Sequence, residues 1–304
     1  MRIQYTRVSV QVPATSANLG PGFDSLGLAL DLCDELEVEA TTGAVEISVD
    51  GEGARALPSG EDHLVVRALR RGLDHAGAPQ TGLRLHATNR IPHGRGLGSS
   101  AAATVAGLLL ARGMISDPDA LDDQTVLQLA SEFEGHPDNA APALLGGVVL
   151  SWMQGGIARA VELSVAEQAL RPVVLLPTTT LATHQARGLL PAEVPHADAV
   201  FNASRSALLV HALAGAPELL VEATEDRLHQ DQRAAGMPES VELMRVLRRE
   251  GHPAVISGAG PSVLVMAGAR AQIAPLVRRF VADPAAWRIA EVPLRQLPAA
   301  PVVG

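Results

Sequence analysis

Three glycines alternate with other residues between a strand-like and a helix-like segment, and this arrangement limits the possible folds more than any other part of the chain. Residues 83–91 (LRLHATNRI) have the mixed apolar and polar pattern of a short strand. Residues 92–102 (PHGRGLGSSAA) follow, and residues 99–112 form an alanine-rich helical pattern that Gly113 closes. Glycines let backbone N–H groups approach an anion, and a helix start adds unpaired N–H groups and a positive dipole end. The order of strand, glycine loop and helix therefore predicts a phosphate-binding site.

Two other glycine-rich phosphate motifs are excluded by the residues around the loop. A Walker A loop needs a lysine before its Ser or Thr, and residues 92–102 contain none. Residues 96–101 (GLGSSA) satisfy the loose dinucleotide pattern, but that fold also needs an acidic residue after a second strand, about 20 positions further on. Residues 116–119 (SDPD) are loop-like, with no strand pattern before them. A plain tight turn would explain one glycine pair, but three glycines before two serines favour a triphosphate site.

A triphosphate loop without a lysine needs another source of positive charge. The helix start supplies part of it, and Mg²⁺ binds through a few protein oxygen ligands together with phosphates. Ser100 in the loop and Glu132 on a later helical segment are the candidate ligands. For Glu132 alone, a solvated position on the surface of a helix is the competing interpretation.

The length of the chain and the order of its elements predict two domains of the α+β class. At 304 residues the chain exceeds the length at which one hydrophobic core usually keeps growing. We place the domains at residues 1–160 and 161–304. We assign the α+β class because the strands and helices do not follow a uniform βαβ repeat. We expect the proline-rich end after Val292 to be loose. The patterns predict strands at 6–12, 36–40, 44–49, 83–91, 146–152, 172–176, 254–257, 262–266 and 287–292, and helices at 62–76, 99–112, 125–134, 183–190, 197–213, 218–228, 239–249 and 271–281.

The composition argues against several classes of partner. A net charge of -9 opposes long-range attraction to nucleic acid or anionic lipid. Cys33 is the only cysteine, which excludes an internal disulfide and fits a reducing compartment. Two uncharged stretches, 139–158 and 251–269, are interrupted by proline and glycine, and the N-terminus lacks a signal-peptide pattern. We therefore expect a cytoplasmic protein that binds neither nucleic acid nor a membrane.

Three segments together resemble the GHMP kinases over nearly the whole chain. Residues 13–24 (PATSANLGPGFD), 92–102 and 256–262 (ISGAGPS) match the three motifs of that superfamily in order and spacing. Taken alone, residues 13–24 could equally be a surface loop. Residues 18–24 and 135–139 (GHPDN) resemble the homoserine kinases more than the mevalonate or galactose kinases. The resemblance implies a ribosomal-S5-like N-terminal domain and a ferredoxin-like C-terminal domain, with ATP and substrate bound between them.

The resemblance also implies an activity and a set of site residues. It implies transfer of the ATP γ-phosphoryl group to the side-chain hydroxyl of L-homoserine, with Mg²⁺, in threonine biosynthesis. ATP would bind at Pro92, His93, Gly94, Arg95, Gly96, Leu97, Gly98, Ser99, Ser100, Ala101 and Ala102. Homoserine would bind at Asn18, Asp24, His136, Asp138, Thr183, Arg187 and Arg233. The catalytic group would comprise Ser100, Glu132, Asp138 and Asn139, with Mg²⁺ on Ser100 and Glu132, although Glu134 is near enough to replace Glu132. The family further implies a homodimer and places His63 near the adenine.

The charges of these residues suit an amino-acid substrate. Homoserine is a zwitterion, so Asp24 and Asp138 can bind its ammonium group, and Arg187 and Arg233 its carboxylate. Because a loose phosphoryl transition state needs little prior proton removal, we expect no dedicated general base, with Asp138 as the alternative base. Two further interpretations stay open: another GHMP kinase with a sugar or isoprenoid alcohol as substrate, and a nucleotide-binding module without catalysis.

Overall fold

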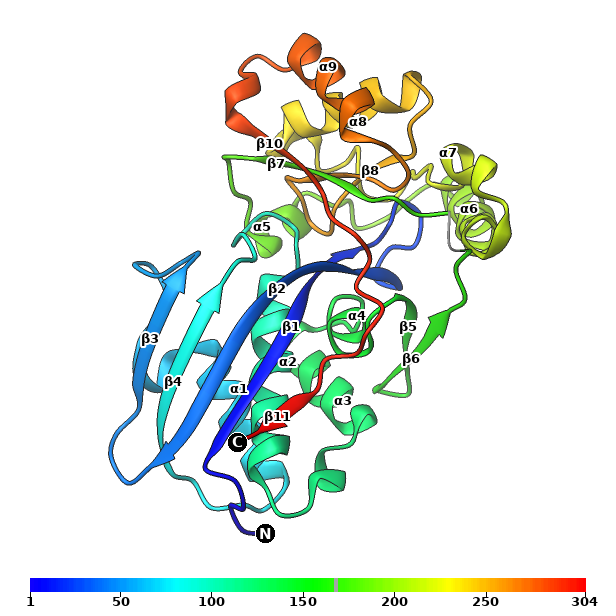
Figure 1. Cartoon of the computed structure of the whole chain (residues 1–304). Coiled ribbons are helices and arrows are strands. Elements are labelled where there is room, and N and C mark those ends of the chain that lie inside the picture. Colours follow the sequence, from blue (N-terminus) through cyan, green and yellow to red (C-terminus); the bar gives the residue numbers. More distant parts are fainter. Residues whose placement is uncertain (167–168) are drawn as a thin grey trace.

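The chain folds into two β-sheets with helices packed against them (Figure 1), and the computed structural model describes residues 1–166 and 169–304. The first sheet has seven strands, in the order β11-β1-β2-β4-β3, with β5 joined to β2 and β6 joined to β5. Its strands are β1 (Arg7–Ala17), β2 (Leu26–Thr41), β3 (Glu46–Gly51), β4 (Gly82–Asn89), β5 (Val148–Gln154), β6 (Ile157–Leu163) and β11 (Pro301–Val303). One face of this sheet carries the helices α1 (Leu64–His75), α2 (Ser99–Met114), α3 (Asp123–Glu134) and α4 (Ala140–Leu145).

The second sheet has four strands in the order β10-β7-β9-β8 and lies above the first in Figure 1. Its strands are β7 (Val173–Pro177), β8 (Ala254–Ile256), β9 (Val263–Val265) and β10 (Trp287–Glu291). The helices of this part are α5 (Thr183–Gly188), α6 (His196–Gly215), α7 (Leu220–Ala223), α8 (Pro238–Arg249) and α9 (Arg270–Phe280). Short 3₁₀ turns lie at Gly60–Asp62, Pro118–Leu121, Pro217–Leu219, Ala234–Gly236 and Pro284–Ala286.

Small and branched apolar side chains build the core. Val173 and Leu175 of β7 pack with α8 and α9, whereas Val174 and Leu176 join the larger core that continues into the first sheet. This alternation follows from the two-residue period of a strand, and it buries the second sheet on both faces. In α2, Gly107 lets the backbone of α1 approach, since a Cβ atom there would lie 2.3 Å from Val65 O.

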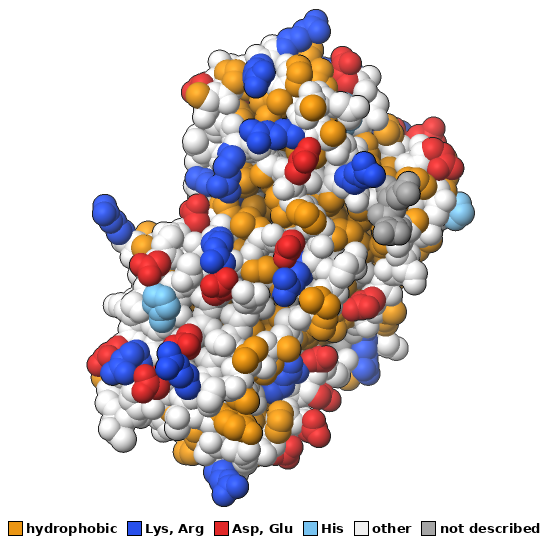
Figure 2. All heavy atoms as spheres, viewed as in Figure 1, with side chains coloured by type: hydrophobic (Ala, Val, Ile, Leu, Met, Phe, Trp, Pro, Cys, Tyr) orange, Lys and Arg blue, Asp and Glu red, His pale blue; other side chains and the backbone are white. Residues whose placement is uncertain are grey.

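The uncovered face of the first sheet carries interleaved charges (Figure 2). Its exposed ion pairs run across neighbouring strands: Arg7 with Glu37, Arg84 with Glu39 and Glu46, and Arg90 with Glu35. Because each arginine lies beside a glutamate, this face combines both signs of charge. None of the helices in the described parts of the chain has the length and apolar character to cross a membrane.

The expected elements are present with shifted ends, and three expectations were wrong. α2 continues through Gly113, because that glycine allows close packing on Val8, whose Cγ1 would lie 2.5 Å from an added Cβ. The helix expected at 218–228 shortens to α7, because the Asp226 side chain accepts backbone N–H groups and forms a turn instead. The end of the chain is ordered: β11 pairs with β1, and Gly147 N donates to Arg295 O at 2.7 Å.

The division at residue 160 stays a prediction. β6 spans that residue, and β11 returns from the other end of the chain to the first sheet (Figure 1). The first sheet therefore takes strands from both proposed domains. Residues 13–17, for which a surface loop was one of two interpretations, continue β1 past a bulge between Pro13 and Ala14 and are buried.

Candidate active site

The glycine loop lies where the end of β1 meets the turn after β8. Thr15 N donates to Leu97 O at 3.1 Å, and Gly258 N donates to Ala17 O at 3.1 Å. The Ser257 hydroxyl donates to Gly96 O at 2.6 Å. The three segments singled out in the sequence thus form one hydrogen-bonded unit.

The backbone conformation favours glycine at all three loop positions, and close neighbours exclude a side chain at two of them. Gly94, Gly96 and Gly98 have φ values of 64°, 69° and 66°, in the left-handed region that favours glycine. A Cβ atom at Gly96 would lie 2.1 Å from Ser257 O, and one at Gly98 would lie 1.9 Å from Thr15 Oγ1. α2 begins directly after Gly98 without a side-chain cap. A concave loop that ends at an uncapped helix start can bind an anion through backbone N–H groups.

Two cavities meet at this helix start. One cavity, of about 230 Å³, lies between the loop and residues of the second part of the chain, including Arg187 and Arg233. The other, of about 450 Å³, lies on the α1 side and is lined by His63 and Phe133 among others. Both cavities are lined by Ser99, Ser100 and Glu134. A ligand that spans both cavities would therefore pass the start of α2.

The acidic residue beside Ser100 is Glu134, which corrects the expected pairing with Glu132. The Ser100 hydroxyl donates to Glu134 Oε1 at 2.6 Å. Burial raises the pKa of Glu134, although the hydrogen bond from Ser100 opposes this effect. Glu132 lies on the outer side of α3, where it accepts from Arg71 at 3.2 Å. Residues two positions apart on a helix face different directions, so only one of the two glutamates faces the loop.

A buried carboxylate and a histidine lie opposite Glu134 in the smaller cavity. His136 Nδ1 is hydrogen bonded to Asp138 Oδ1. Burial disfavours protonation of His136, but the hydrogen bond and charge of Asp138 outweigh it and raise its pKa. One side-chain atom each of Asp24, His136 and Asp138 that could bind a metal ion, a carboxylate oxygen or a ring nitrogen, lies within 4.8 Å of the other two. Asn139 Nδ2 donates to Asp138 Oδ1 at 3.2 Å, and the Thr15 hydroxyl donates to Asn139 Oδ1 at 2.8 Å.

The two arginines of the smaller cavity differ in their partners. Arg187 donates from both terminal nitrogens to Asp24, at 2.6 and 3.2 Å. Arg233 is only 1% exposed, and its Nη1 donates to Gly258 O at 3.3 Å and to His229 Nδ1 at 3.3 Å. In residues 1–166 and 169–304, no carboxylate forms an ion pair with Arg233, and burial lowers its pKa. Because an unpaired buried charge is costly, an anionic ligand group would stabilise this site.

Most of the residues expected at the site line one of the two cavities, whereas Asp24, Glu132 and three loop residues line neither. Asn18 and Thr183 line the smaller cavity; Asn18 Nδ2 donates to Gly258 O at 2.8 Å, and Asn18 Oδ1 accepts from Asp24 N at 3.0 Å. His93 lines the larger cavity. The loop residues that line neither cavity are Pro92, Arg95 and Ala102. Arg95 turns toward Thr178 O, 3.3 Å from its Nη2.

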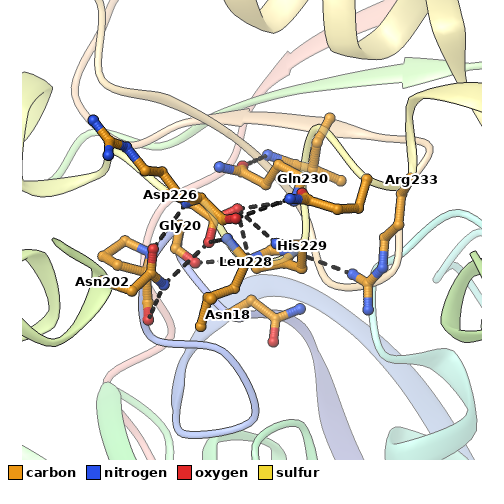
Figure 3. Close-up of polar contacts among 12 residues, drawn as sticks. Asn18, Gly20, Asn202, Asp226, Leu228, His229, Gln230 and Arg233 are labelled. Atoms are coloured by element: carbon orange, nitrogen blue, oxygen red, sulfur yellow. Dashed lines mark hydrogen bonds and ion pairs between the residues drawn. The ribbon is translucent and has the colours of Figure 1, made fainter. Parts of the chain in front are cut away.

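Some polar residues at or behind the site were not predicted from the sequence. Thr15 fills the space beside Gly98, and its place in the small polar run of residues 13–24 was a usable signal. Asn202, Asp226 and His229 lie behind Arg233 (Figure 3). These three residues show no periodic pattern that would have marked them.

Comparisons with known proteins agree with this geometry. The GHMP kinases N terminal domain matches residues 63–147, which include the glycine loop. A homoserine kinase from Streptomyces avermitilis is 55% identical over 261 residues, which are 86% of this chain and 85% of that protein. One from Clavibacter michiganensis is 51% identical over 282 residues, 91% and 89% of the two chains. The crystal structure of homoserine kinase from Cytophaga hutchinsonii matches with a TM-score of 0.82 at 26% identity, over 98% of each chain, and this confirms the expected α+β GHMP kinase fold. The chain therefore belongs to the homoserine kinase family of the GHMP kinases.

Proposed function

We propose that the chain is a phosphotransferase that moves the γ-phosphoryl group of ATP to the side-chain hydroxyl of L-homoserine, which gives O-phospho-L-homoserine for threonine biosynthesis. The main support is the distribution of charge in the smaller cavity. Arg233 is a buried cation without a carboxylate partner among the described residues, and Asp138 is a buried carboxylate in the same cavity. Homoserine carries a carboxylate that can pair with Arg233 and an ammonium group that can pair with Asp138. Galactose carries neither charge, and mevalonate lacks the ammonium group.

Each end of homoserine has matching partners. The carboxylate binds Arg233, whose planar guanidinium can donate two parallel hydrogen bonds. Arg187 lies in the same cavity, and Asp24 already holds it in a bidentate pair. The ammonium group binds the carboxylates of Asp24 and Asp138, which lie close to each other. Thr183 and Asn18 complete the cavity wall.

ATP binds along the boundary of the two cavities. Its phosphates lie on the glycine loop and the start of α2, where N–H groups and the helix dipole favour negative charge. The nucleoside occupies the larger cavity, which has His63 and Phe133 in its wall. The γ-phosphate then lies near Ser100, where the two cavities meet. Holding both reactants in this way makes the transfer effectively intramolecular.

Ser100 and Glu134 are suited to hold Mg²⁺. Glu134 is a half-buried carboxylate whose pKa is raised by burial, and a nearby cation would offset the cost of its charge. A carboxylate with a hydroxyl provides the few oxygen ligands that Mg²⁺ takes beside phosphates. When bound, the ion supplies neutralisation of the phosphate charge, which is the contribution that a lysine would make in other phosphate loops.

We assign no dedicated general base to the reaction. Asp138 is already hydrogen bonded to His136 and Asn139, so it serves the ammonium group and the geometry of the cavity. Asn139 is fixed by Thr15 beside Gly98, which places its amide next to the phosphate loop. In a loose transition state, positioning and charge neutralisation can carry the reaction, and the hydroxyl proton passes late to an oxygen of the transferred phosphoryl group.

The test is a coupled ADP-release assay with L-homoserine, L-serine, L-threonine, mevalonate and galactose as acceptors. We expect a clear preference for L-homoserine. Preference for another acceptor would refute the substrate, and ATP binding without ADP release would refute the activity. Replacing Arg187 or Arg233 with alanine should raise the KM for homoserine. A homodimer and a cytoplasmic location rest on family resemblance and composition, and both stay predictions.

A further inference from the structure

A buried histidine holds the guanidinium of Arg233 (Figure 3). Arg233 Nη1 lies 3.3 Å from His229 Nδ1, and His229 Nε2 lies 2.7 Å from Gly20 O. A carbonyl oxygen can only accept a hydrogen bond, so Nε2 must carry the proton. In the neutral ring, Nδ1 is then an acceptor, which is the role that an arginine donor needs. The Gly20 carbonyl therefore fixes the tautomer that can bind Arg233.

His229 is kept neutral by its surroundings. It is fully buried, and burial lowers its pKa, while the charge of Asp226 opposes this effect without reversing it. A protonated ring would donate from Nδ1 and would place a second cation against Arg233. The neutral ring avoids both conflicts.

Asp226 and Asn202 fix the turn that carries His229. Asp226 accepts hydrogen bonds from the backbone N–H groups of Leu228, His229 and Gln230, at 2.9, 3.1 and 2.8 Å. Asn202 Nδ2 donates to Asp226 Oδ1 at 3.1 Å. The charge of Asp226 is thus used by the turn, and Figure 3 shows these contacts converging on the Asp226 carboxylate.

The same histidine contacts the loop that carries Asp24. Phe23 stacks on the His229 ring, with ring centroids 4.8 Å apart. The Arg233 guanidinium carbon lies 5.2 Å from the centroid of the Phe23 ring. Gly20 and Phe23 belong to residues 18–24, which also carry Asp24, the partner of Arg187. The positions of Arg233 and Asp24 are therefore linked through one imidazole ring.

We propose that His229 is a positioning residue for substrate binding. Its Nδ1 orients the Arg233 guanidinium toward the substrate carboxylate, and its Nε2 ties that orientation to the loop bearing Asp24. Arg233 needs such a partner because no carboxylate of the described chain forms an ion pair with it. This inference rests on the proposed function, in which Arg233 binds the carboxylate of homoserine.

A matched pair of variants separates the two ring nitrogens. In His229→Asn the side-chain oxygen can replace Nδ1 as the acceptor for Arg233. In His229→Gln the longer amide can replace Nε2 as the donor to Gly20 O but leaves Arg233 without its acceptor. Each variant is assayed with L-homoserine and with 3-aminopropan-1-ol, which keeps the hydroxyl and amine but lacks the carboxylate. The measured quantity is kcat/KM for L-homoserine divided by kcat/KM for 3-aminopropan-1-ol.

We expect His229→Gln to lower this ratio about tenfold, the effect of one lost hydrogen bond of ordinary strength. His229→Asn should keep the ratio within about threefold of the original chain, since its acceptor survives. The KM for ATP should stay unchanged in both variants. Equal ratios in the two variants would overturn the positioning role, because loss of packing alone would affect both acceptors alike.

Two further measurements keep the test decisive. Arg233→Ala should lower the ratio about 100-fold, as expected for a lost hydrogen bond between charged groups. If it leaves the ratio unchanged, the carboxylate assignment fails, and the role of His229 fails with it. If Arg233→Ala lowers the ratio and neither His229 variant does, only the role of His229 fails. Nitrogen NMR of the unmodified protein needs no variant to fold: a neutral ring protonated at Nε2 supports the inference, and one protonated at Nδ1 overturns it.

Discussion

Replacing Glu134 with glutamine tests whether this residue, rather than Glu132, holds Mg²⁺. The substitution keeps the shape of the side chain and removes one negative charge beside Ser100, whose hydroxyl lies 2.6 Å from Glu134 Oε1. Interactions with a charged partner contribute about 1.5–3 kcal/mol, and about 1.4 kcal/mol corresponds to a factor of ten. We therefore expect the Mg²⁺ concentration for half-maximal rate to rise about 10-fold to 140-fold.

Glu132→Gln is the matched control, two positions earlier on the same helix. The Glu132 side chain is 45% exposed and lies 3.2 Å from Arg71, in a surface ion pair. Such pairs contribute at most about 1 kcal/mol, which corresponds to a factor of about five, so the shift in its Mg²⁺ dependence should stay below about fivefold. The assay is the initial rate of ADP release at saturating ATP and homoserine across a Mg²⁺ titration. Equal shifts in the two variants, or a larger shift in Glu132→Gln, would refute the assignment of Glu134.

Three further predictions follow from the same contacts. Gly98→Ala should destabilise the fold by about 1–2 kcal/mol for its left-handed backbone plus about 1–3 kcal/mol for the clash with Thr15. Gly94→Ala should show only the first cost in urea unfolding, because its nearest neighbour would lie 3.4 Å away; equal costs would contradict the clash. Asp138→Asn should raise the KM for homoserine about tenfold or more while the acidic limb of the pH-rate profile persists. Loss of that limb with an unchanged KM would instead identify Asp138 as the general base. Because the pKa of His229 is lowered in the fold, the unfolded chain binds more protons below about pH 6.5, so stability falls as pH decreases there. His229→Gln should show a shallower fall in urea unfolding, and an unchanged slope would count against a neutral His229.

Local patterns were sufficient to predict the phosphate loop and its helix. The alternating glycines of residues 92–102 predicted an anion site, and the structure gives all three the left-handed φ that only glycine adopts easily. The small apolar residues after Ser99 predicted the helix that begins there. These signals are local, because backbone conformation and helix starts depend mainly on neighbouring residues.

Contacts between distant residues could not be predicted in the same way. Glu132 and Glu134 belong to one predicted helix, and only the packing of α3 against α2 decides which of them reaches Ser100. Arg187 and Asp24 are 163 positions apart and form a bidentate pair that no spacing indicates. Motif resemblance supplied both residues, but only the fold showed that they bind each other.

The role of a glycine is hard to predict from sequence, because a glycine can meet several different needs. Gly113 was interpreted as a helix stop, whereas it permits the close approach of Val8 within a continuing helix. Gly98 was interpreted as a means of approaching phosphate, and it also makes room for the Thr15 hydroxyl. A sequence shows that the side chain is missing but does not show which neighbour occupies the space.

Contacts beside Gly98 connect the glycine loop with Asp138. Thr15 Oγ1 fills this space and donates to Asn139 Oδ1, and Asn139 Nδ2 donates to Asp138 Oδ1. The conformation of the glycine loop and the position of Asp138, the carboxylate proposed to bind the acceptor, are thus linked by one chain of contacts. A side chain at Gly98 would displace Thr15 and, through Asn139, disturb Asp138. Under the proposed function, the loop glycine therefore contributes to acceptor binding as well as to phosphate binding.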